Sequence, residues 1–253
     1  MISRAQITKR ASEDGVDARV VERDYVLAHV VALISAHDTQ AALVFKGGAS
    51  LRLLHFDEYR YSADVDYSLA RGSEMDAHEL IRGAFSQPRS EAITELSLDG
   101  APPRINYVGP LGAKRTIKLD IADDELVVNT EKRPLLKKRW PDLPDVTVNA
   151  YTRLEIAAEK LRCILQRLQC RDLLDLALLF EEGIDPADAA ELFRRKAAHR
   201  RLDAKSFASK YEQRVVDYEP RWDRELVDSL AEVPHFDEIE RSVRRTLRKA
   251  QLL

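Results

Sequence analysis

Apolar residues near the start of the chain follow two different periods. Over residues 17–35 they recur every three or four positions, which predicts an amphipathic helix with Asp17 as its N-cap. Residues 41–45 (AALVF) instead form a continuous apolar run that stops at Gly47 and Gly48, after which apolar positions resume. This order predicts a strand, a tight turn and a helix.

Residues 64–69 (DVDYSL) alternate between polar and apolar side chains. Alternation is typical of a strand with one buried face, so Val65, Tyr67 and Leu69 are expected to face the core. Asp64 and Asp66 then lie together on the opposite face.

Two further strands are predicted at residues 104–108 and 115–121, because β-branched and aromatic residues alternate on both sides of a turn at residues 109–112. The second strand buries every other residue and leaves Lys118 and Asp120 on its polar face. Before this hairpin, residues 73–86 have helical composition, with Ser73 as candidate cap and Pro88 beyond the end.

The chain changes character after residue 130. Prolines 134, 141 and 144 indicate a loop-rich, basic connection. Beyond residues 146–148 the pattern is helical to the end, and the predicted helices cover residues 151–169, 172–182, 186–196 and 235–252. We therefore predict an α+β protein, with a mixed sheet flanked by helices in a lobe at residues 1–148 and a helical lobe at residues 149–253.

Composition excludes a membrane protein. The 253 residues are 45% hydrophobic and 33% charged, and no apolar run is long enough to cross a bilayer. There is no secretory signal, and Cys163 and Cys170 are too few for a disulfide framework, so we expect a cytoplasmic location and ordinary packing of both thiols. The formal net charge of −3 requires that any nucleic-acid partner be held by local basic stripes.

The polar face of residues 64–69 carries the candidate chemistry. Two strand aspartates spaced as Asp-x-Asp can bind Mg²⁺ while a nucleoside triphosphate supplies further oxygens, and Asp120 can add a third carboxylate. A Gly47-Gly48 turn lets backbone N–H groups approach phosphate oxygens, and Ser50 can donate one more hydrogen bond. This order of elements is the arrangement that phosphoryl transfer requires of a nucleotidyltransferase core.

Four blocks of the sequence resemble the AbiEii family of nucleotidyltransferase-like toxins and the related mycobacterial toxins that modify transfer RNA. The blocks are Val21 to Leu27, Phe45 to Leu51 with Tyr61 to Leu69, Lys118-Leu119-Asp120, and Glu155 to Leu161 with Arg171 to Leu176. The resemblance implies a polymerase-beta-like nucleotidyltransferase fold, an enzyme that uses Mg²⁺ and an NTP, and a role in toxin–antitoxin systems and phage defence with a cognate antitoxin.

Residue roles follow from the resemblance by position. Asp64 is implied to be the principal catalytic and metal-binding acid with Asp66 beside it, Lys160 to contact the triphosphate, and Asp175 to complete the site from the helical lobe. Ser62 matches a position at which some related toxins are phosphorylated. The sequence departs from the family at Ala49, where Thr is usual, and at Ala63, where Glu is common. The residues expected to bind the nucleotide are Lys46, Gly47, Gly48, Ser50, Ser62, Arg167 and Arg171.

Cations on the first helix of the helical lobe suit phosphate binding. If the helix predicted at residues 151–169 continued to residue 171, Lys160, Arg167 and Arg171 would share a narrow sector opposite the apolar stripe, although a solvated basic face explains them equally well. An unbroken helix would separate Lys160 from Asp175 by about 22 Å. We therefore predict a break near residues 169–170, with Asp172 capping a helix that folds back.

Three basic clusters can follow an RNA backbone, at residues 132–139, 194–201 and 241–249. Interleaved acids in the last two make a solvated surface or an antitoxin contact comparable explanations. The leading hypothesis is transfer of a nucleoside monophosphate to the 3′ end of tRNA, which would block translation. The alternatives are transfer to a protein or small-molecule hydroxyl, and a non-catalytic module that senses NTPs.

Overall fold

The chain folds into two units. The computed structural model describes residues 2–70, 76–86 and 93–253. Contacts assign residues 1–151 and 229–231 to the first unit, and residues 152–228 and 232–253 to the second. The division along the main chain falls three residues after the boundary expected from the sequence.

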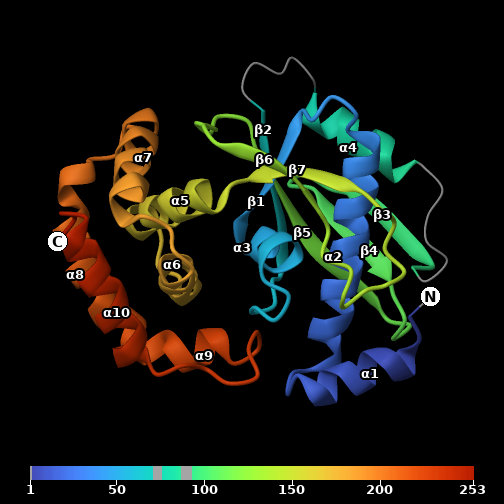
Figure 1. The fold of residues 1–253 in the computed structure, drawn as a ribbon. Helices are drawn as coiled ribbons and strands as arrows, with labels where there is room; N and C mark the ends of the chain where they lie inside the picture. The colour runs from blue at the N-terminus through green and yellow to red at the C-terminus, as the bar shows by residue number, and fades with distance from the viewer. Residues whose placement is uncertain (1, 71–75, 87–92) are drawn as a thin grey trace. The chain divides into compact units, whose positions relative to one another are not determined.

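The first unit is a mixed sheet with helices (Figure 1). Its helices are α1 (Arg4–Glu13), α2 (Ala18–His37), α3 (Gly47–Ser50), the π-helix η1 (Leu51–His55) and α4 (Ala77–Phe85). Its strands are β1 (Leu43–Lys46), β2 (Asp64–Leu69), β3 (Glu95–Asp99), β4 (Arg104–Val108), β5 (Lys114–Ala122), β6 (Thr130–Pro134) and β7 (Thr147–Tyr151).

The strands form one seven-stranded sheet in the order β3-β4-β5-β2-β1-β7-β6. β2 pairs antiparallel with β1 and parallel with β5, and β1 pairs parallel with β7. The two strands that carry Asp64, Asp66 and Asp120, β2 and β5, therefore lie in the interior of the sheet. The α+β class expected from the sequence is confirmed.

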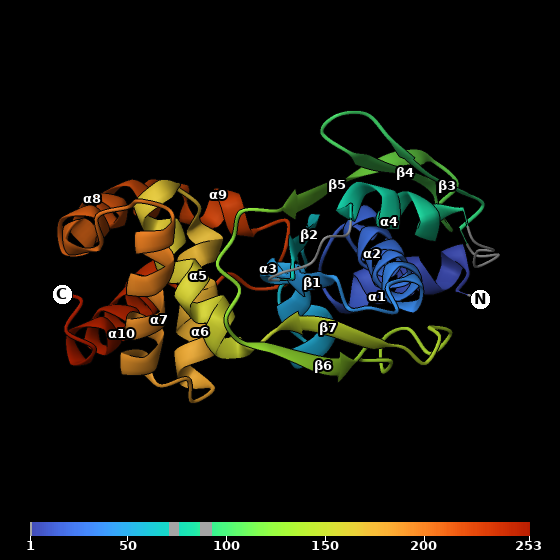
Figure 2. The same cartoon turned by 90° about the horizontal axis from the view of Figure 1, so that it is seen from above.

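One face of the sheet packs on α2 and α4, and Figure 2 shows the sheet curving around these helices. Val65 and Tyr67 of β2 belong to this core and are buried, as the alternation predicts. α2 begins where expected, because the Asp17 side chain accepts a hydrogen bond from the Arg19 amide at 2.7 Å.

Two predictions for the first unit need correction or lie outside the described residues. The connection at residues 130–148 is not merely a loop, because its ends pair as β6 and β7 with Thr130 opposite Tyr151. Prolines obscured this hairpin in the sequence, but Pro134 occupies the last residue of an edge strand, where no amide donor is needed. The expected cap Ser73 and the expected terminator Pro88 lie outside the described residues; α4 itself has Asp76 as its N-cap.

The second unit consists of helices. They are α5 (Arg153–Gln166), α6 (Cys170–Glu181), α7 (Pro186–His199), η2 (Ala204–Ser206), α8 (Phe207–Tyr218), η3 (Glu219–Arg221), α9 (Trp222–Leu226) and α10 (Phe236–Lys249). α5 packs against α6, α7 and α8, and aromatic pairs such as Phe193 with Phe207, at 5.2 Å between ring centroids, fill the interior. In the described part of the chain, no helix combines the length and apolar character needed to span a bilayer.

α8 and α9 were missed in the sequence. Their apolar positions are sparse: Phe207, Tyr211 and Tyr218 are the buried residues of α8, and Trp222 and Leu226 those of α9. A few large aromatic side chains carry the packing there, so the apolar periodicity is weak.

Candidate active site

Charged side chains form a row across three neighbouring strands of the first unit. The sheet register places Lys46 of β1 directly opposite Asp66 of β2, and Asp66 beside Asp120 of β5. Residues paired across adjacent strands point to the same face of a sheet. One cation and two carboxylates therefore lie side by side on the face opposite the core.

Asp64 joins this row from two residues earlier in β2, where it lies beside Lys118 of β5. Lys118 and Asp120 form an ion pair of 3.8 Å, and 60% of the Asp120 side chain is exposed. Val65, between the two aspartates of β2, and Leu119, between Lys118 and Asp120 of β5, are fully buried on the other face. The predicted separation of the carboxylates from the apolar positions is confirmed.

The turn at Gly47 brings the backbone against the Asp66 carboxylate. Gly47 has a φ of +77°, and a Cβ at this position would lie 2.5 Å from Oδ2 of Asp66. At Gly48 a Cβ would collide with the guanidinium of Arg60. Gly47 therefore requires glycine because of its positive φ and its contact with Asp66, whereas a side chain at Gly48 would require the Arg60 guanidinium to shift. The first amides of a helix lack intrahelical acceptors, so this turn presents N–H donors beside the carboxylates.

Three other predicted nucleotide contacts lie around this turn. Lys46 is buried, with Nζ 5.8 Å from the Tyr151 ring centroid. The Ser50 hydroxyl donates to the Gly47 carbonyl at 2.8 Å, which uses its proton within the turn. Ser62 is also buried, so phosphorylation of this residue would require local opening. Binding of a nucleotide by these side chains stays a prediction.

Arginines hold the segment that leads into β2. Arg52, Arg60 and Arg23 each donate to a different backbone carbonyl within residues 59–62, Arg60 at 3.3 Å and Arg23 at 3.2 Å. Because this segment ends two residues before Asp64, these contacts fix where the carboxylates enter the sheet.

A buried ion pair anchors this arrangement. Nε of Arg52 lies 2.6 Å from Oδ1 of Asp24, and both side chains are 2% exposed. Trp140 donates from Nε1 to the other Asp24 oxygen at 3.0 Å. The Arg52 guanidinium also lies 3.6 Å from the Tyr61 ring centroid. Sequence reasoning assigned no role to Asp24; the available signal was an acid among apolar positions of a predicted helix.

In the second unit, Lys160 and Asp175 come together. The Lys160 side chain is 5% exposed, and Nζ lies 2.6 Å from Oδ2 of Asp175 and 2.9 Å from Oδ1 of Asp172. The predicted fold-back of the chain is confirmed, because α5 ends at Gln166 and α6 begins at Cys170.

The break also corrects the predicted line of three cations. Arg167 and Arg171 are not on the helix of Lys160, since α5 ends before either residue. Arg167 instead binds Asp172 through two hydrogen bonds of 2.8 Å, and Nε of Arg171 donates to Gln169 at 2.9 Å. Any contact of these arginines with phosphate stays a prediction.

Asp172 does not cap α6, contrary to the sequence-based expectation. The N-cap is Gln169, which makes no side-chain capping bond, and Asp172 lies in the first turn. Burial alone would raise the pKa of the Asp172 carboxyl, but the ammonium of Lys160 and the guanidinium of Arg167 outweigh burial and lower it. Asp172 and Asp175 are three residues apart on one helix face, which is the signal that could have paired both with Lys160.

Two of the predicted basic clusters are partly neutralised. Lys196 is not a surface cation: it is 1% exposed and its Nζ lies 2.6 Å from Oε1 of the buried Glu155. Arg244 forms ion pairs with Glu212 and Glu240, both at 2.5 Å. These contacts favour structural explanations for the two residues.

The carboxylate row suits a hard cation. Mg²⁺ prefers oxygen ligands and is commonly held by one or two carboxylates together with substrate phosphates and water. Asp64 and Asp66 offer such a pair, with Asp120 on the neighbouring strand. Within residues 2–70, 76–86 and 93–253, no three His, Cys, Asp or Glu side chains are gathered as a ready-made metal site. Asp64 and Asp66 supply carboxylate oxygens, the ligand type that Mg²⁺ takes.

The fold is nucleotidyltransferase-like. It combines a mixed sheet, a carboxylate row on its central strands and a glycine turn against Asp66. The family model described as "Nucleotidyl transferase AbiEii toxin, Type IV TA system" matches residues 30–247. The chain belongs to this family of nucleotidyltransferase toxins of type IV toxin–antitoxin systems, as the resemblance of its sequence motifs indicates.

The solved structures that match this chain include a nucleotidyltransferase toxin and a nucleotidyltransferase-like protein. MenT4, a nucleotidyltransferase toxin from Mycobacterium tuberculosis, is 17% identical with a TM-score of 0.74, over 100% of this chain and 91% of that one. An antigenic nucleotidyltransferase-like protein from Paracoccidioides brasiliensis is 14% identical with a TM-score of 0.44, over 75% and 93% of the two chains. No curated protein sequence matches this chain.

Proposed function

We propose that the protein transfers a nucleoside monophosphate from an NTP to the 3′ end of tRNA and that the reaction requires Mg²⁺. The observation that carries this proposal is the row of Asp66 and Asp120, with Asp64 beside it, next to the Gly47 turn. The family assignment supports the reaction class.

Each part of the row has a chemical task in this proposal. Asp64 and Asp66 would hold the magnesium ion, which neutralises charge on the phosphate oxygens. The backbone amides at Gly47 and Gly48 donate to the triphosphate. A carboxylate of the row accepts the proton of the attacking RNA hydroxyl as its oxygen bonds to the α-phosphorus and the bond to pyrophosphate breaks.

Residues of the second unit enter the proposal as phosphate-binding groups. Lys160 and Asp175 are ion-paired, so a triphosphate contact by Lys160 would add to or replace part of that pairing. Removal of Lys160 would leave two buried carboxylates without this cation, which is costly. Lys160→Arg, which keeps the charge but changes its geometry, is therefore a better test than Lys160→Ala.

The experiment is incubation of the purified protein with each α-³²P-labelled NTP, Mg²⁺ and total tRNA. We expect label in RNA with at least one NTP, and its loss when Mg²⁺ is chelated. Asp64→Asn and Asp66→Asn should reduce labelling about 100-fold or more, as losses of catalytic electrostatic groups do. Asp145→Asn, which alters a 95% exposed side chain that pairs with Lys137, is the matched control and should label RNA normally.

Absence of label from RNA with all four NTPs would refute the tRNA acceptor. The formal net charge of −3 favours a second acceptor class, a protein hydroxyl, because the overall field does not attract a polyanion. Labelled protein bands with unlabelled RNA would support that acceptor. Binding of NTP without release of pyrophosphate to any acceptor would support a non-catalytic sensor.

A further inference from the structure

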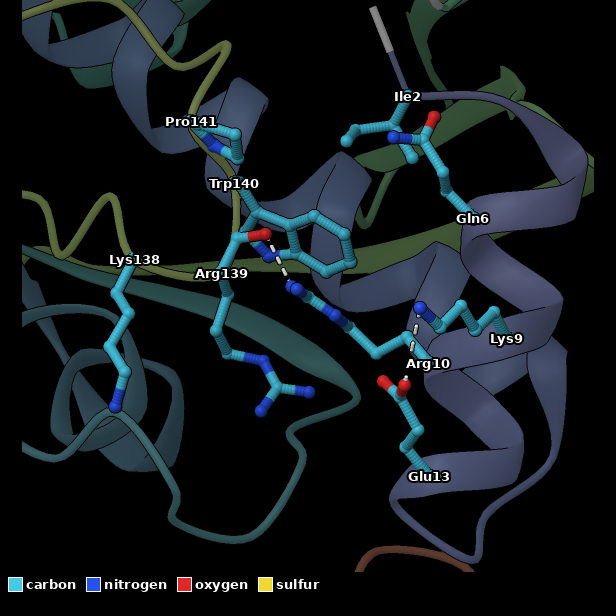
Figure 3. Close-up of a pocket in the computed structure, with 9 residues that line it drawn as sticks. All are labelled: Ile2, Gln6, Lys9, Arg10, Glu13, Lys138, Arg139, Trp140 and Pro141. Carbon is cyan, nitrogen blue, oxygen red and sulfur yellow. Dashed lines mark hydrogen bonds and ion pairs between the residues drawn. The ribbon is translucent and has the colours of Figure 1, made fainter.

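A cationic pocket lies in the first unit away from the carboxylate row. It has a volume of about 240 Å³ and is formed by α1 and residues 138–141 (Figure 3). Four of the side chains that line it are cationic and one is acidic: Lys9, Arg10, Lys138, Arg139 and Glu13. Trp140 supplies an apolar wall. The local charge is opposite to that of the Asp64 and Asp66 face.

Three of these cations have acidic partners. Lys9 pairs with Glu13 at 3.7 Å, Lys138 with Asp57 at 3.2 Å, and Arg139 with Asp14.

Arg10 differs, because within residues 2–70, 76–86 and 93–253 no carboxylate forms an ion pair with it. Its guanidinium donates to the Arg139 carbonyl and lies 4.9 Å from the Trp140 ring centroid. Figure 3 shows the side chain reaching from α1 towards this carbonyl beside the indole. Both contacts orient the guanidinium and neither cancels its charge.

We infer that this pocket binds a backbone phosphate of the RNA acceptor, with Arg10 as the contacting group. The planar guanidinium matches the oxygens of a phosphate, and the pocket holds its charge in a fixed position. An RNA strand gains nothing electrostatically from the carboxylate row, so cations elsewhere must supply its affinity. This inference rests on the proposed RNA acceptor.

The pocket is connected to the catalytic strand. Arg139 donates to the Tyr61 hydroxyl at 2.5 Å, and Tyr61 precedes Asp64 by three residues. The Arg139 contact therefore links the pocket to the segment that leads into β2.

The test measures binding of fluorescently labelled tRNA to the full-length protein without NTP, at several salt concentrations. Arg10→Gln keeps a long polar side chain that can still donate to the Arg139 carbonyl but removes the charge. Arg4→Gln, on the same helix and outside the pocket, is the matched control. We expect Arg10→Gln to weaken binding about tenfold and to reduce the slope of log K against log salt by about 0.7 to 0.9.

Arg10→Gln should also raise KM for RNA while leaving kcat at saturating RNA and the affinity for NTP unchanged. Equal RNA binding by wild type and Arg10→Gln would overturn the inference, as would a loss of NTP affinity instead. Arg10-dependent binding of inorganic phosphate without Arg10-dependent binding of RNA would also overturn it.

The outcomes separate the two proposals. RNA that binds through Arg10 but is never labelled supports the phosphate site and refutes the RNA acceptor. If wild type and Arg10→Gln label RNA equally when RNA is limiting, the RNA acceptor is supported and the phosphate site is refuted. A melting temperature measured for each variant separates loss of binding from loss of folding.

Discussion

At the residue scale, Gly47 meets two demands at once: a left-handed backbone and contact with a carboxylate. Gly47→Ala should lower the unfolding free energy by roughly 1–2 kcal/mol, because Ala is strained at positive φ. It should also reduce transfer activity at least about tenfold, because the new methyl group displaces the Asp66 carboxylate. Urea unfolding and the labelling assay measure the two effects.

Gly112 provides the matched control for that substitution. Its φ is +76°, yet a Cβ there would meet no atom within 4 Å. Gly112→Ala should therefore carry a similar backbone strain and leave activity unchanged. Equal losses of activity in the two variants would show that backbone strain, and not the contact with Asp66, explains the requirement for glycine.

The Asp24–Arg52 ion pair leads to a prediction about stability. Asp24→Ala should lower the unfolding free energy by about 3–5 kcal/mol, because Arg52 would keep a buried charge without this partner. Arg19 and Asp17 form an exposed pair, so Arg19→Ala should cost no more than about 1 kcal/mol. Similar values for the two variants, measured by urea unfolding, would contradict a structural role for the buried pair.

The positions of some site residues could be predicted from the sequence, and those of others could not. Asp64, Asp66 and Asp120 could be placed on one face from alternation alone, because strand parity is fixed by backbone geometry. Arg52 and Arg60 could not be, since their contacts depend on how a π-helix and an irregular segment fold back. Spacing along the chain carries no information about such contacts.

At the element scale, the break between α5 and α6 decides the electrostatics of the second unit. It allows Asp172 and Asp175 of one helix to face Lys160 of the other. The need for a break was predictable from helix length, whereas its consequence for Arg167 was not. Three residues outside regular helix were enough to move Arg167 from the expected cationic line into a contact with Asp172.

The lowered pKa of the Asp172 carboxyl makes the contribution of this cluster pH-dependent. A carboxyl with a depressed folded-state pKa stabilises the protein above its ordinary pKa of 3.8, and this stabilisation is lost as the pH falls below that value. The loss of stability in Asp172→Asn, relative to wild type, should therefore be largest near neutral pH and shrink in acid. Urea unfolding across that range measures the difference.

Asp145→Asn is the control for this pH series, because the Asp145 side chain is 95% exposed. Its stability should stay close to that of wild type at every pH. A difference between wild type and Asp172→Asn that stays constant into acid would show that the charge of Asp172 does not stabilise the fold.

At the scale of the whole molecule, the sequence predicted a sheet-containing part followed by a helical part, because the apolar period changes from two to about 3.6 residues. It did not predict α1 or β3. It also missed β6 and β7, since prolines interrupt the region, and α8 and α9, since few aromatic residues hold them. Strong apolar periodicity was therefore sufficient to predict most elements from the sequence. Elements that pack through isolated large side chains could not be predicted in this way.

The two cysteines, Cys163 and Cys170, report on folding of the second unit. Burial raises the pKa of Cys163 to about 11 and that of Cys170 to about 12. A disulfide reagent at about pH 8 should therefore react with neither thiol in the native protein and with both in urea. Rapid reaction of either thiol without denaturant would show that this unit opens readily.

Residues 229–231 have a consequence for dissecting the protein. They belong to the first unit although the chain on both sides belongs to the second, and the Ser229 carbonyl accepts a hydrogen bond from the Tyr61 amide at 2.8 Å. A single protease cut after Tyr151 therefore cannot yield two complete fragments. The amino-terminal piece would lack a backbone partner three residues before Asp64, so the two halves are expected to regain activity only when they are recombined.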